Sequence, residues 1–403
     1  MISVKEAETI ILDLVRAIEE TETVNLENGS GRVLATTVTS KLDFPYWDNS
    51  AMDGYAVRYG DVEKYSDLEI VEEIPAGYKP QKTILPGQAA RIFTGGMMPE
   101  GADTIVIQEN TEKIGNKVKI LSSPQPKEYV RKRGSFYQAG KPMLEGGIVI
   151  TPPDIAVLAT AQCNSLTVYR RPRVAIFSTG DELITPDATL QPGQIIDSNQ
   201  YALAAIVAQN GGIPIQLGII PDNKKLLGET IAKATQQADL VLSTGGVSVG
   251  EYDYVEEILA ELGAKIQIRS IAVKPGKPLT VANFSNNCLY FGIPGNPVSA
   301  LVSCWRFVLP ALKKLSGVKN GWKPEFTVAI AAQRMTGNSK RESYLWGKIN
   351  IVDGNYIFEV AGGSKSSGNL INLAQTNALA MIPLGVKEVA AGDRIMVMLV
   401  DRS

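Results

Sequence analysis

Two loops of small residues follow apolar runs in the second half of this chain, and both carry groups suited to binding a ligand. The loop STGDE (residues 178–182) follows the run VAIF, and STGG (residues 243–246) follows LVL. Glycine frees backbone N–H groups to donate to an anion at the carboxyl end of a buried strand. One such loop is usually a simple turn, but two with the same opening in one predicted sheet favour a binding site.

Carboxylates recur around these loops, where they would repel a negative ligand unless a cation were also present. The acids are Asp181, Glu182, Asp197, Asp222, Glu251 and Asp253. Helix capping explains any one of them about as well as ligand binding does, because aspartate commonly begins helices. Mg²⁺ prefers a few carboxylates together with phosphate oxygens, so a divalent ion would let these acids share a site with a phosphate.

The loop KPGKP (residues 274–278) adds two cationic side chains, Lys274 and Lys277. A lysine ammonium is a point charge that suits phosphate or another oxyanion. Alone, this loop would be read as a solvated turn. Its prolines restrict φ, however, and indicate a loop that holds its lysines in position. The motif FGIPGNPVSA follows and predicts another strand that ends in a Gly/Pro turn.

The composition excludes several kinds of chemistry. The chain has no histidine, which rules out imidazole acid–base catalysis, a Ser-His-Asp triad and a His-ligated metal. Cys163, Cys288 and Cys304 lack the paired spacing of a zinc site, so we expect them to pack as small hydrophobic residues in a reducing compartment. Catalysis must therefore use carboxylates, lysines, hydroxyls, backbone dipoles or an oxygen-bound metal.

Charge and hydropathy place the chain among cytoplasmic proteins with neither a nucleic-acid nor a membrane partner. Lys and Arg (40) nearly balance Asp and Glu (42), so no overall field attracts nucleic acid or anionic lipid. No apolar run reaches the ~18 residues of a membrane span. The first 20 residues are acidic, unlike a secretory signal, and predict an amphipathic helix with Ile10, Leu14 and Ile18 on one face.

The hydrophobic pattern divides the 403 residues into regions, as expected for a chain too long for one core. Residues 43–144 alternate Gly, Pro and short β-branched runs, which predicts a mostly β domain. Residues 171–318 alternate buried-strand runs with helical segments, which predicts a parallel sheet in a three-layer α/β domain. Residues 319–403 contain evenly spaced short strands, typical of a small β-barrel or sandwich. Residues 1–42 and 145–170 supply helices and linkers.

Seven motifs in a fixed order give the chain a specific resemblance that runs nearly end to end. They are DNSAMDGYAVR, RIFTGGMMPEGADTIV, RRPRVAIFSTGDEL, IIDSN, STGGVSVGEYDY, VKPGKPL and GIPGNPVSA. In this set the chain resembles the molybdopterin molybdenumtransferase family, which completes the molybdenum cofactor and includes the C-terminal domain of gephyrin. A single glycine loop would be a weak signal, whereas this ordered set is highly specific.

The resemblance implies a multidomain α/β and β protein that forms a homodimer with a shared active site. Residues 1–42 and 145–170 would form the dimerisation domain. The site would lie between the α/β molybdopterin-binding domain of one subunit and the β-rich domain of the other. The substrates would be adenylated molybdopterin, made by a molybdopterin adenylyltransferase, and molybdate. Molybdenum would be inserted and AMP released, with Mg²⁺ as cofactor.

The resemblance also assigns site residues. The implied catalytic residues are Asp53, Thr94, Glu182, Asp222, Asp253, Lys274 and Lys277. The implied metal ligands are Glu182, Asp222 and Asp253. The implied substrate-binding residues are Ser178, Thr179, Gly180, Asp181, Asp197, Ser198, Asn199, Thr244, Gly245, Gly246, Ser248, Gly250, Glu251, Pro294, Gly295, Asn296, Pro297, Arg341 and Ser367.

The chain departs from the family pattern at a few positions. Ser135 and Phe136 stand where the family commonly has Glu-Asp, Trp346 where it has a second arginine, and Ser270 where it has a basic residue. We expect Phe136 to be buried and to replace a polar network with apolar packing. Two alternatives stay open. One is a catalytically weakened binding or scaffold protein of the same fold, and the other is a nucleotide pyrophosphatase related to the α/β domain alone, although that class lacks DNSAMDGYAV and the barrel.

Overall fold

The computed structural model describes all residues except 247–253, 363–365, 367 and 401–403. The chain forms two compact units. Unit 1 comprises Met1–Thr36, Gly146–Pro152 and Ser165–Ser403, and unit 2 comprises Thr37–Glu145 and Pro153–Asn164. The candidate loops of the sequence analysis lie in unit 1, apart from Asp53 and Thr94, which lie in unit 2.

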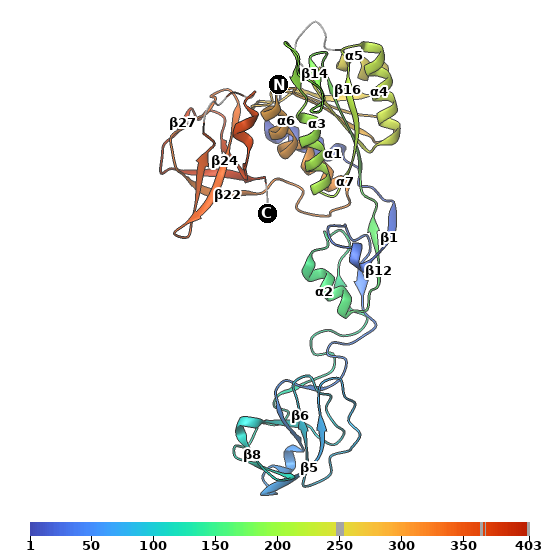
Figure 1. Cartoon of the computed structure of the whole chain (residues 1–403), viewed down its shortest axis with the longest axis vertical. Helices are drawn as coiled ribbons and strands as arrows, with labels where there is room; N and C mark the ends of the chain where they lie inside the picture. The colour runs from blue at the N-terminus through green and yellow to red at the C-terminus, as the bar shows by residue number, and fades with distance from the viewer. Residues whose placement is uncertain (247–253, 363–365, 367, 401–403) are drawn as a thin grey trace. The chain divides into compact units, whose positions relative to one another are not determined.

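A six-stranded sheet forms the centre of unit 1 (Figure 1). In order across the sheet its strands are β16 (Ile213–Ile220), β13 (Arg173–Thr179), β17 (Leu240–Thr244), β21 (Leu289–Ile293), β20 (Pro278–Asn283) and β18 (Lys265–Ser270). The first four run parallel, whereas β20 is antiparallel to both of its neighbours. The sheet is therefore mixed rather than entirely parallel. Its central runs are continuously apolar because both of their faces are covered.

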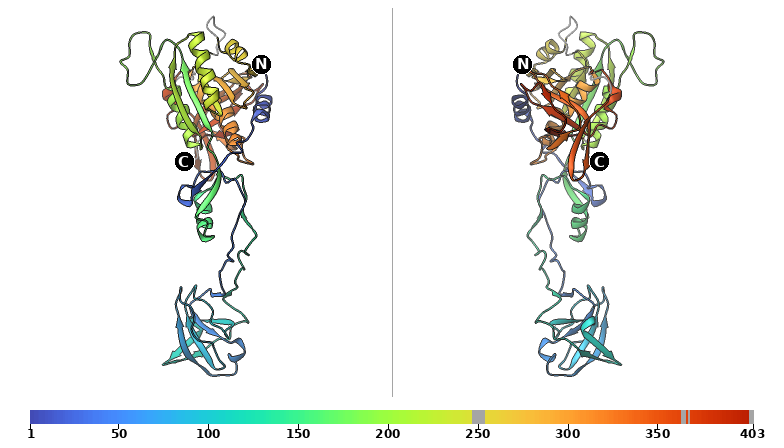
Figure 2. Two further views of the ribbon diagram at one scale, coloured as in Figure 1. Left: turned by 90° about the vertical axis from the view of Figure 1, so that its right-hand side faces the viewer. Right: turned by 90° about the vertical axis from the view of Figure 1, so that its left-hand side faces the viewer.

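Helices cover both faces of this sheet, so the three-layer prediction is confirmed (Figure 1, Figure 2). One face carries α3 (Asn199–Gln209), α6 (Pro297–Ser303) and α7 (Leu309–Leu315), and the other carries α4 (Lys224–Gln237) and α5 (Val255–Glu261). Side chains alternate between the two cores along β13: Ile176 faces the first, and Phe177 faces the second.

The N-terminal helix α1 (Val4–Leu14) packs in the first of these cores, where it contacts α7. Its buried face includes Ala7 and Ile11, whereas Ile10 is half-buried and Ile18 lies beyond the end of the helix. The helix is therefore shorter than predicted, but Ile10 and Leu14 pack against this core and Ile18 is buried in it, in agreement with the predicted apolar face. Helix α2 (Pro152–Thr160) is not part of this core.

Five strands close the C-terminal barrel, because β24 pairs with both β25 and β26. They are β22 (Phe326–Ala331), β24 (Glu342–Val352), β25 (Asn355–Val360), β26 (Ala378–Ile382) and β28 (Arg394–Leu399). The prediction of a small C-terminal barrel is confirmed.

Strand β24 belongs to two cores at once. Leu345 points into the barrel core, while Tyr344 and Trp346 pack in the core of the α/β domain. The short strand β19 (Val273–Lys274) then pairs in parallel with the start of β24, where Lys274 lies opposite Ser343. The loop that carries the two candidate lysines is thereby fixed to the barrel.

Unit 2 is built on a second six-stranded sheet, in agreement with the prediction of a mostly β domain. Its strands in order are β7 (Thr104–Ile107), β4 (Gly54–Val57), β6 (Gln88–Ile92), β5 (Asp67–Ile74), β9 (Lys117–Ile120) and β8 (Thr111–Ile114). Only β5 and β6 pair in parallel within this sheet. Small apolar cores cover both of its faces.

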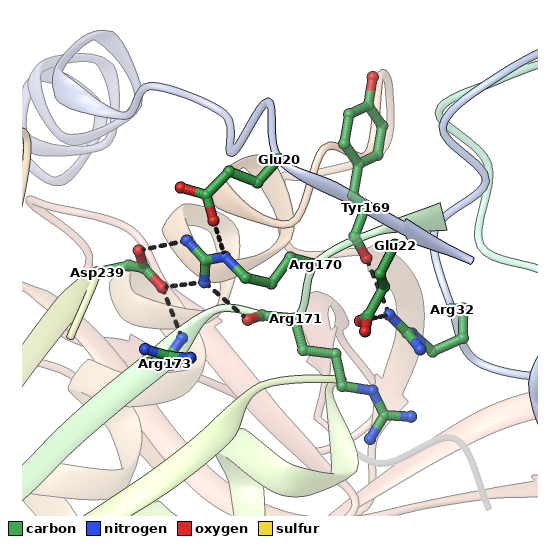
Figure 3. Close-up of polar contacts among 8 residues, drawn as sticks. All are labelled: Glu20, Glu22, Arg32, Tyr169, Arg170, Arg171, Arg173 and Asp239. Carbon is green, nitrogen blue, oxygen red and sulfur yellow. Dashed lines mark hydrogen bonds and ion pairs between the residues drawn. The ribbon is translucent and has the colours of Figure 1, made fainter. Parts of the chain in front are cut away.

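Two antiparallel strands, β1 (Thr21–Asn25) and β12 (Ser165–Tyr169), form a separate ribbon of unit 1. The Arg32 guanidinium contacts the Glu22 carboxylate and donates to the Tyr169 carbonyl at 3.0 Å (Figure 3). Arg32 is buried, so these contacts offset part of the cost of burying its charge, although its Nε has no partner among the described residues.

The ribbon is tied to the central sheet by Arg170. Its two terminal nitrogens donate to both oxygens of Asp239 at 2.9 and 3.0 Å, and its Nε contacts Glu20 (Figure 3). Asp239 also accepts a hydrogen bond from the Arg173 amide at 2.7 Å. Hydrogen bonding to Asp239, followed by that to Glu20, holds the pKa of Arg170 above its ordinary value. Asp239 directly precedes β17, so this cluster anchors the strand whose other end reaches the candidate site.

Phe136 is not buried as predicted: 73% of its surface is exposed within the chain. Its backbone amide donates to the Phe44 carbonyl at 2.8 Å, but its side chain replaces no internal polar network. The hypothesis that Phe136 supplies apolar packing in the chain is therefore wrong. Whether Phe136 is buried could not be predicted from the sequence, because an isolated aromatic residue in a loop has no hydrophobic periodicity that separates buried from exposed positions.

Two expectations drawn from composition can be compared with the structure. Cys288 and Cys304 are buried, and that burial raises the pKa of each thiol to about 12, which confirms their packing as unreactive hydrophobic residues. Cys163 is only partly buried. In the described ranges, none of the helices has both the length and the apolar character needed to cross a membrane.

Candidate active site

The two glycine loops of the sequence emerge next to each other at one edge of the central sheet. Strands β13 and β17 are parallel neighbours, and Ser178 lies opposite Thr244 in their register. The hydroxyl oxygens of these two residues are 2.9 Å apart and form a buried hydrogen bond. The carboxyl ends of both strands thus present their loops at one place, as the sequence predicts for a ligand site.

Glycine is required where these loops touch. Gly245 has a φ of 88°, and a Cβ added to it would lie 2.4 Å from the Thr179 carbonyl oxygen. A Cβ on Gly295, in the GIPGNP loop, would lie 3.6 Å from the Gly245 Cα, in ordinary van der Waals contact, so the two loops touch there. Three strand-end loops therefore approach each other through their backbones, which leaves N–H groups near any ligand bound above them.

Asp222 is oriented by a residue of the first glycine loop. The Thr179 hydroxyl donates to the Asp222 carboxylate at 2.7 Å, and the Asp222 amide donates to the Asp181 carboxylate at 3.1 Å. Asn223, and not Asp222, caps helix α4 by accepting from the Leu226 amide at 3.1 Å. Helix capping therefore does not explain Asp222, which remains a candidate ligand.

Asp197, in contrast, is explained by capping. Its buried carboxylate accepts hydrogen bonds from the Asn199 and Gln200 amides at 3.1 and 3.3 Å, and from the Gln200 side chain at 3.2 Å. The Asn199 side chain in turn donates to the Gly295 carbonyl at 2.7 Å. Asp197 thus fixes the start of α3, and Asn199 joins that helix to the GIPGNP loop.

These loops surround a cavity of about 480 Å³, which we name the sheet-edge cavity. The predicted substrate-binding residues that line it are Thr179, Asp197, Ser198, Asn199, Thr244, Gly245, Gly246, Pro294, Gly295, Asn296 and Pro297. Glu182 also lines it, and its carboxylate has no hydrogen bond or ion pair with any residue that the structure describes. Ser178, Gly180 and Asp181 belong to the same loop region without lining the cavity.

A second cavity of about 420 Å³, the cation cavity, lies between the KPGKP loop and strand β24. Lys274, Lys277 and Arg341 line it, and none of them forms an ion pair within the described ranges of the chain. The Arg341 guanidinium donates at 3.5 Å to the Val273 carbonyl. Pro278 lines both cavities, so the two adjoin. Three cations without acidic partners make this cavity suited to an oxyanion.

Asp53 and Thr94 form a pair in unit 2. The Asp53 carboxylate accepts from the Thr94 amide at 2.7 Å and from its hydroxyl at 2.8 Å. The backbone hydrogen bond is the largest of several effects that hold the pKa of Asp53 below its ordinary value, and the Thr94 hydroxyl and the Arg91 charge act in the same direction. Thr94 therefore fixes the direction of the Asp53 carboxylate and favours its charged form.

Several predicted residues cannot be placed. Ser248, Gly250, Glu251, Asp253 and Ser367 lie outside the described residues.

Sequence reasoning missed part of the cation cavity. Ser299, Ser343 and Tyr344 line it, as does Trp346, which the sequence analysis noted only as a departure from the family pattern. The even spacing of short strands predicted the barrel, but it could not show that the strand face with Tyr344 and Trp346 packs on another domain. Trp346 is 5% exposed, so at the usual place of an arginine the cavity has an apolar wall.

Comparison with known proteins identifies the family. Residues 2–161 match the MoeA N-terminal region (domain I and II), residues 175–314 a probable molybdopterin binding domain, and residues 328–400 the MoeA C-terminal region (domain IV). The molybdopterin molybdenumtransferase of Nostoc sp. is 56% identical over 408 residues, which covers 99% of this chain and 94% of that protein. The chain belongs to the molybdopterin molybdenumtransferase family.

More distant relatives support the same family assignment. The molybdopterin molybdenumtransferase of Haemophilus influenzae is 32% identical over 398 residues, or 98% of both chains. The crystal structure of the molybdopterin biosynthesis moeA protein from Pyrococcus horikoshii superposes with a TM-score of 0.84 at 28% identity, and covers 99% of this chain and 100% of that one. The multidomain fold expected from the resemblance is confirmed.

Replacing Thr94 should change the titration of Asp53. Thr94→Val removes the hydroxyl donor but keeps the amide donor, so the pKa of Asp53 should rise towards the ordinary value of about 3.9. Because the folded pKa is lowered, these hydrogen bonds stabilise the fold above the ordinary carboxyl pKa, and that contribution is lost as pH falls through the folded pKa. A carboxyl ¹³C NMR titration measures the shift, with Thr230→Val on helix α4 as control. An unchanged titration in Thr94→Val would refute the assignment of the donor.

Proposed function

We propose that this chain inserts molybdenum into adenylated molybdopterin and releases AMP, the final step of molybdenum cofactor biosynthesis. The observation that carries the proposal is the junction of the two cavities at Pro278. One cavity offers hydroxyls, amides and glycine N–H groups at strand ends. The other offers three cations that form no ion pair with the residues that the structure describes. A phosphate-bearing organic substrate and a small oxyanion therefore find complementary sites side by side.

The cation cavity is the proposed molybdate site. Lys274, Lys277 and Arg341 would offset the negative charge of the oxyanion, and the pairing of β19 with β24 holds the lysine loop and the arginine in register. A preorganised cationic site costs no rearrangement when charge develops during reaction. The Pro275 and Pro278 rings restrict the loop further.

The sheet-edge cavity is the proposed site for adenylated molybdopterin. The glycine loops can offer N–H groups to a phosphate, and Ser198, Asn199 and Asn296 can bind polar edges of a heterocycle. Cleavage of the phosphoanhydride places new negative charge on phosphate oxygens. The neighbouring lysines would stabilise that charge without histidine.

The donors at this edge fit Mg²⁺. Glu182 and Asp222 supply hard carboxylate oxygens, and we propose that they hold the ion, together with Asp253, which lies outside the described residues. Among the residues that the structure describes, three acidic side chains do not come together as a ready-made metal cluster. Mg²⁺ commonly takes one or two carboxylates and completes its shell with substrate phosphates and water. When bound, it would neutralise phosphate oxygens of the substrate.

We further propose that the active site is shared in a homodimer. Asp53 and Thr94 would come from the β-rich domain of a second copy, since they are the only implied catalytic residues in unit 2. The balanced charge of the chain suits a cytoplasmic enzyme, and its adenylated substrate requires an adenylyltransferase upstream.

The scaffold alternative is not favoured, because the described lysines, arginine and strand-end loops are arranged for ligand binding.

AMP release from adenylated molybdopterin in the presence of molybdate tests the function. Lys274→Ala should slow it by about 100-fold, the scale of losing one charge-stabilising group. Lys225→Ala is the matched control, because Lys225 is an exposed helical lysine whose nearest acid, Glu229, is 4.0 Å away. Chelation of Mg²⁺ should slow the natural chain as well. A chromatographic assay of AMP measures the rate of the natural chain, of the chelated enzyme and of both variants. Equal rates for Lys274→Ala and the control would contradict the proposal.

Mixing two inactive variants tests the shared site. A heterodimer of an Asp53→Ala chain and a Lys274→Ala chain would keep one intact site out of two if these residues meet across subunits. AMP release should therefore return to a measurable fraction of the natural rate. Heterodimers isolated with two different affinity tags that show no recovery would place both residues in a site within one subunit.

A further inference from the structure

The wall of the cation cavity is connected to the α/β domain by a chain of buried hydrogen bonds. The Arg306 Nε donates to the Tyr344 hydroxyl at 2.9 Å, and that hydroxyl donates to the Glu342 carboxylate at 2.7 Å. A terminal nitrogen of Arg306 donates to the Glu8 carboxylate at 2.6 Å. One arginine thus links helix α1, the α/β domain and barrel strand β24.

Arg306 and Tyr344 are almost completely removed from water. Arg306 is 6% exposed and Tyr344 1%. Burial opposes the charged form of Glu8, yet the charges of Arg306 and Lys323 outweigh it and hold the pKa of Glu8 below its ordinary value. A buried guanidinium is tolerated only when its donors are paired in good geometry. Arg306 therefore holds Tyr344 in place, because moving the Tyr344 hydroxyl away would leave the Arg306 Nε without a hydrogen-bond acceptor.

The backbone that carries Arg306 is unusual. Cys304–Val308 form a π-helical turn between α6 and α7, and such turns recur at functional sites. The same continuous helical segment begins at the GIPGNP loop of the sheet-edge cavity and places Ser299 in the wall of the cation cavity. A single helical segment thus reaches the sheet-edge cavity, the cation cavity and the Arg306 link.

The position of β24 decides the shape of the cation cavity. Tyr344 and Trp346 form its wall, and Arg341 directly precedes the strand. Lys274 is paired opposite Ser343, only one residue from Tyr344. A shift of β24 would therefore move Arg341 and the wall relative to the lysine loop.

We infer that Arg306 and Tyr344 are positioning residues for the oxyanion substrate, acting through the placement of strand β24 rather than by touching the anion. The inference rests on the proposed function of the cation cavity. It differs from a purely structural role in one measurable respect. Loss of a structural contact lowers stability alone, whereas loss of positioning weakens the oxyanion selectively and leaves binding at the sheet-edge cavity intact.

Tyr344→Phe is the sharpest variant, because it removes one oxygen and keeps the ring in the wall. Molybdate affinity, measured by titration calorimetry on the purified full chain, should fall about tenfold, since small displacements of binding groups have effects of this size or larger. AMP affinity, measured in the same way, should stay within about twofold. Lys225→Met is the control, because it breaks a surface ion pair with Glu229 on helix α4, and neither residue lines the cavity.

Arg306→Lys is a second variant that keeps the buried charge. A lysine ammonium can pair with Glu8 but lacks the fork that also reaches Tyr344, so molybdate affinity should fall here too. Hydrogen exchange of the peptide that spans 342–347 should speed up in both variants, while that of 394–399, across the barrel, should not. The exchange rate reports on the stability of strand β24 itself and can be measured without any ligand.

The outcomes separate the inference from the proposed function. If the natural chain binds molybdate, Lys274→Ala abolishes that binding, and Tyr344→Phe binds as the natural chain does, the positioning role is wrong while the function stands. Equal loss of molybdate and AMP affinity in Tyr344→Phe would also overturn it, in favour of a general structural role. Absence of molybdate binding in the natural chain would overturn the proposed function, and with it the inference.

Discussion

The pairing of β19 with β24 is the contact on which both candidate cavities depend. It spans two residues, yet it attaches the KPGKP loop of the α/β domain to the barrel. Without it the lysines would lie on a free turn. With it they face Arg341 and a wall of buried aromatic side chains, while Pro278 at the end of the loop borders the sheet-edge cavity. The constraint thus turns solvated charges into a preorganised site.

The absence of histidine gives this arrangement its chemical character. A chain without imidazole relies on fixed charges and backbone dipoles, and such groups act only when they are held in place. Thr179 holds Asp222, Thr94 holds Asp53, and Asp197 holds the start of α3. Hydroxyl and carboxylate partners of this kind thus fix these three positions.

The sequence allowed the central features to be predicted because they follow from local pattern. Continuous apolar runs indicated the covered sheet, and the carboxyl ends of neighbouring strands indicated where Ser178 and Thr244 meet. What could not be predicted depends on contacts between distant segments. Glu8 lies on the buried face of α1 because Arg306, almost 300 residues later, neutralises it, and no local pattern predicts a buried carboxylate there. Likewise, nothing local separates the capping Asp197 from Asp222, or reveals that Phe136 is exposed.

Locating molybdenum directly tests the claim that the oxyanion site lies between the lysine loop and the barrel. Crystals of the full chain soaked with molybdate, measured at the molybdenum absorption edge, give an anomalous difference map in which only that element contributes strongly. The account predicts a peak bordered by Lys274, Lys277 and Arg341, which is lost in Lys274→Ala crystals. A peak at another place on the chain, with this cavity occupied by solvent alone, would contradict it.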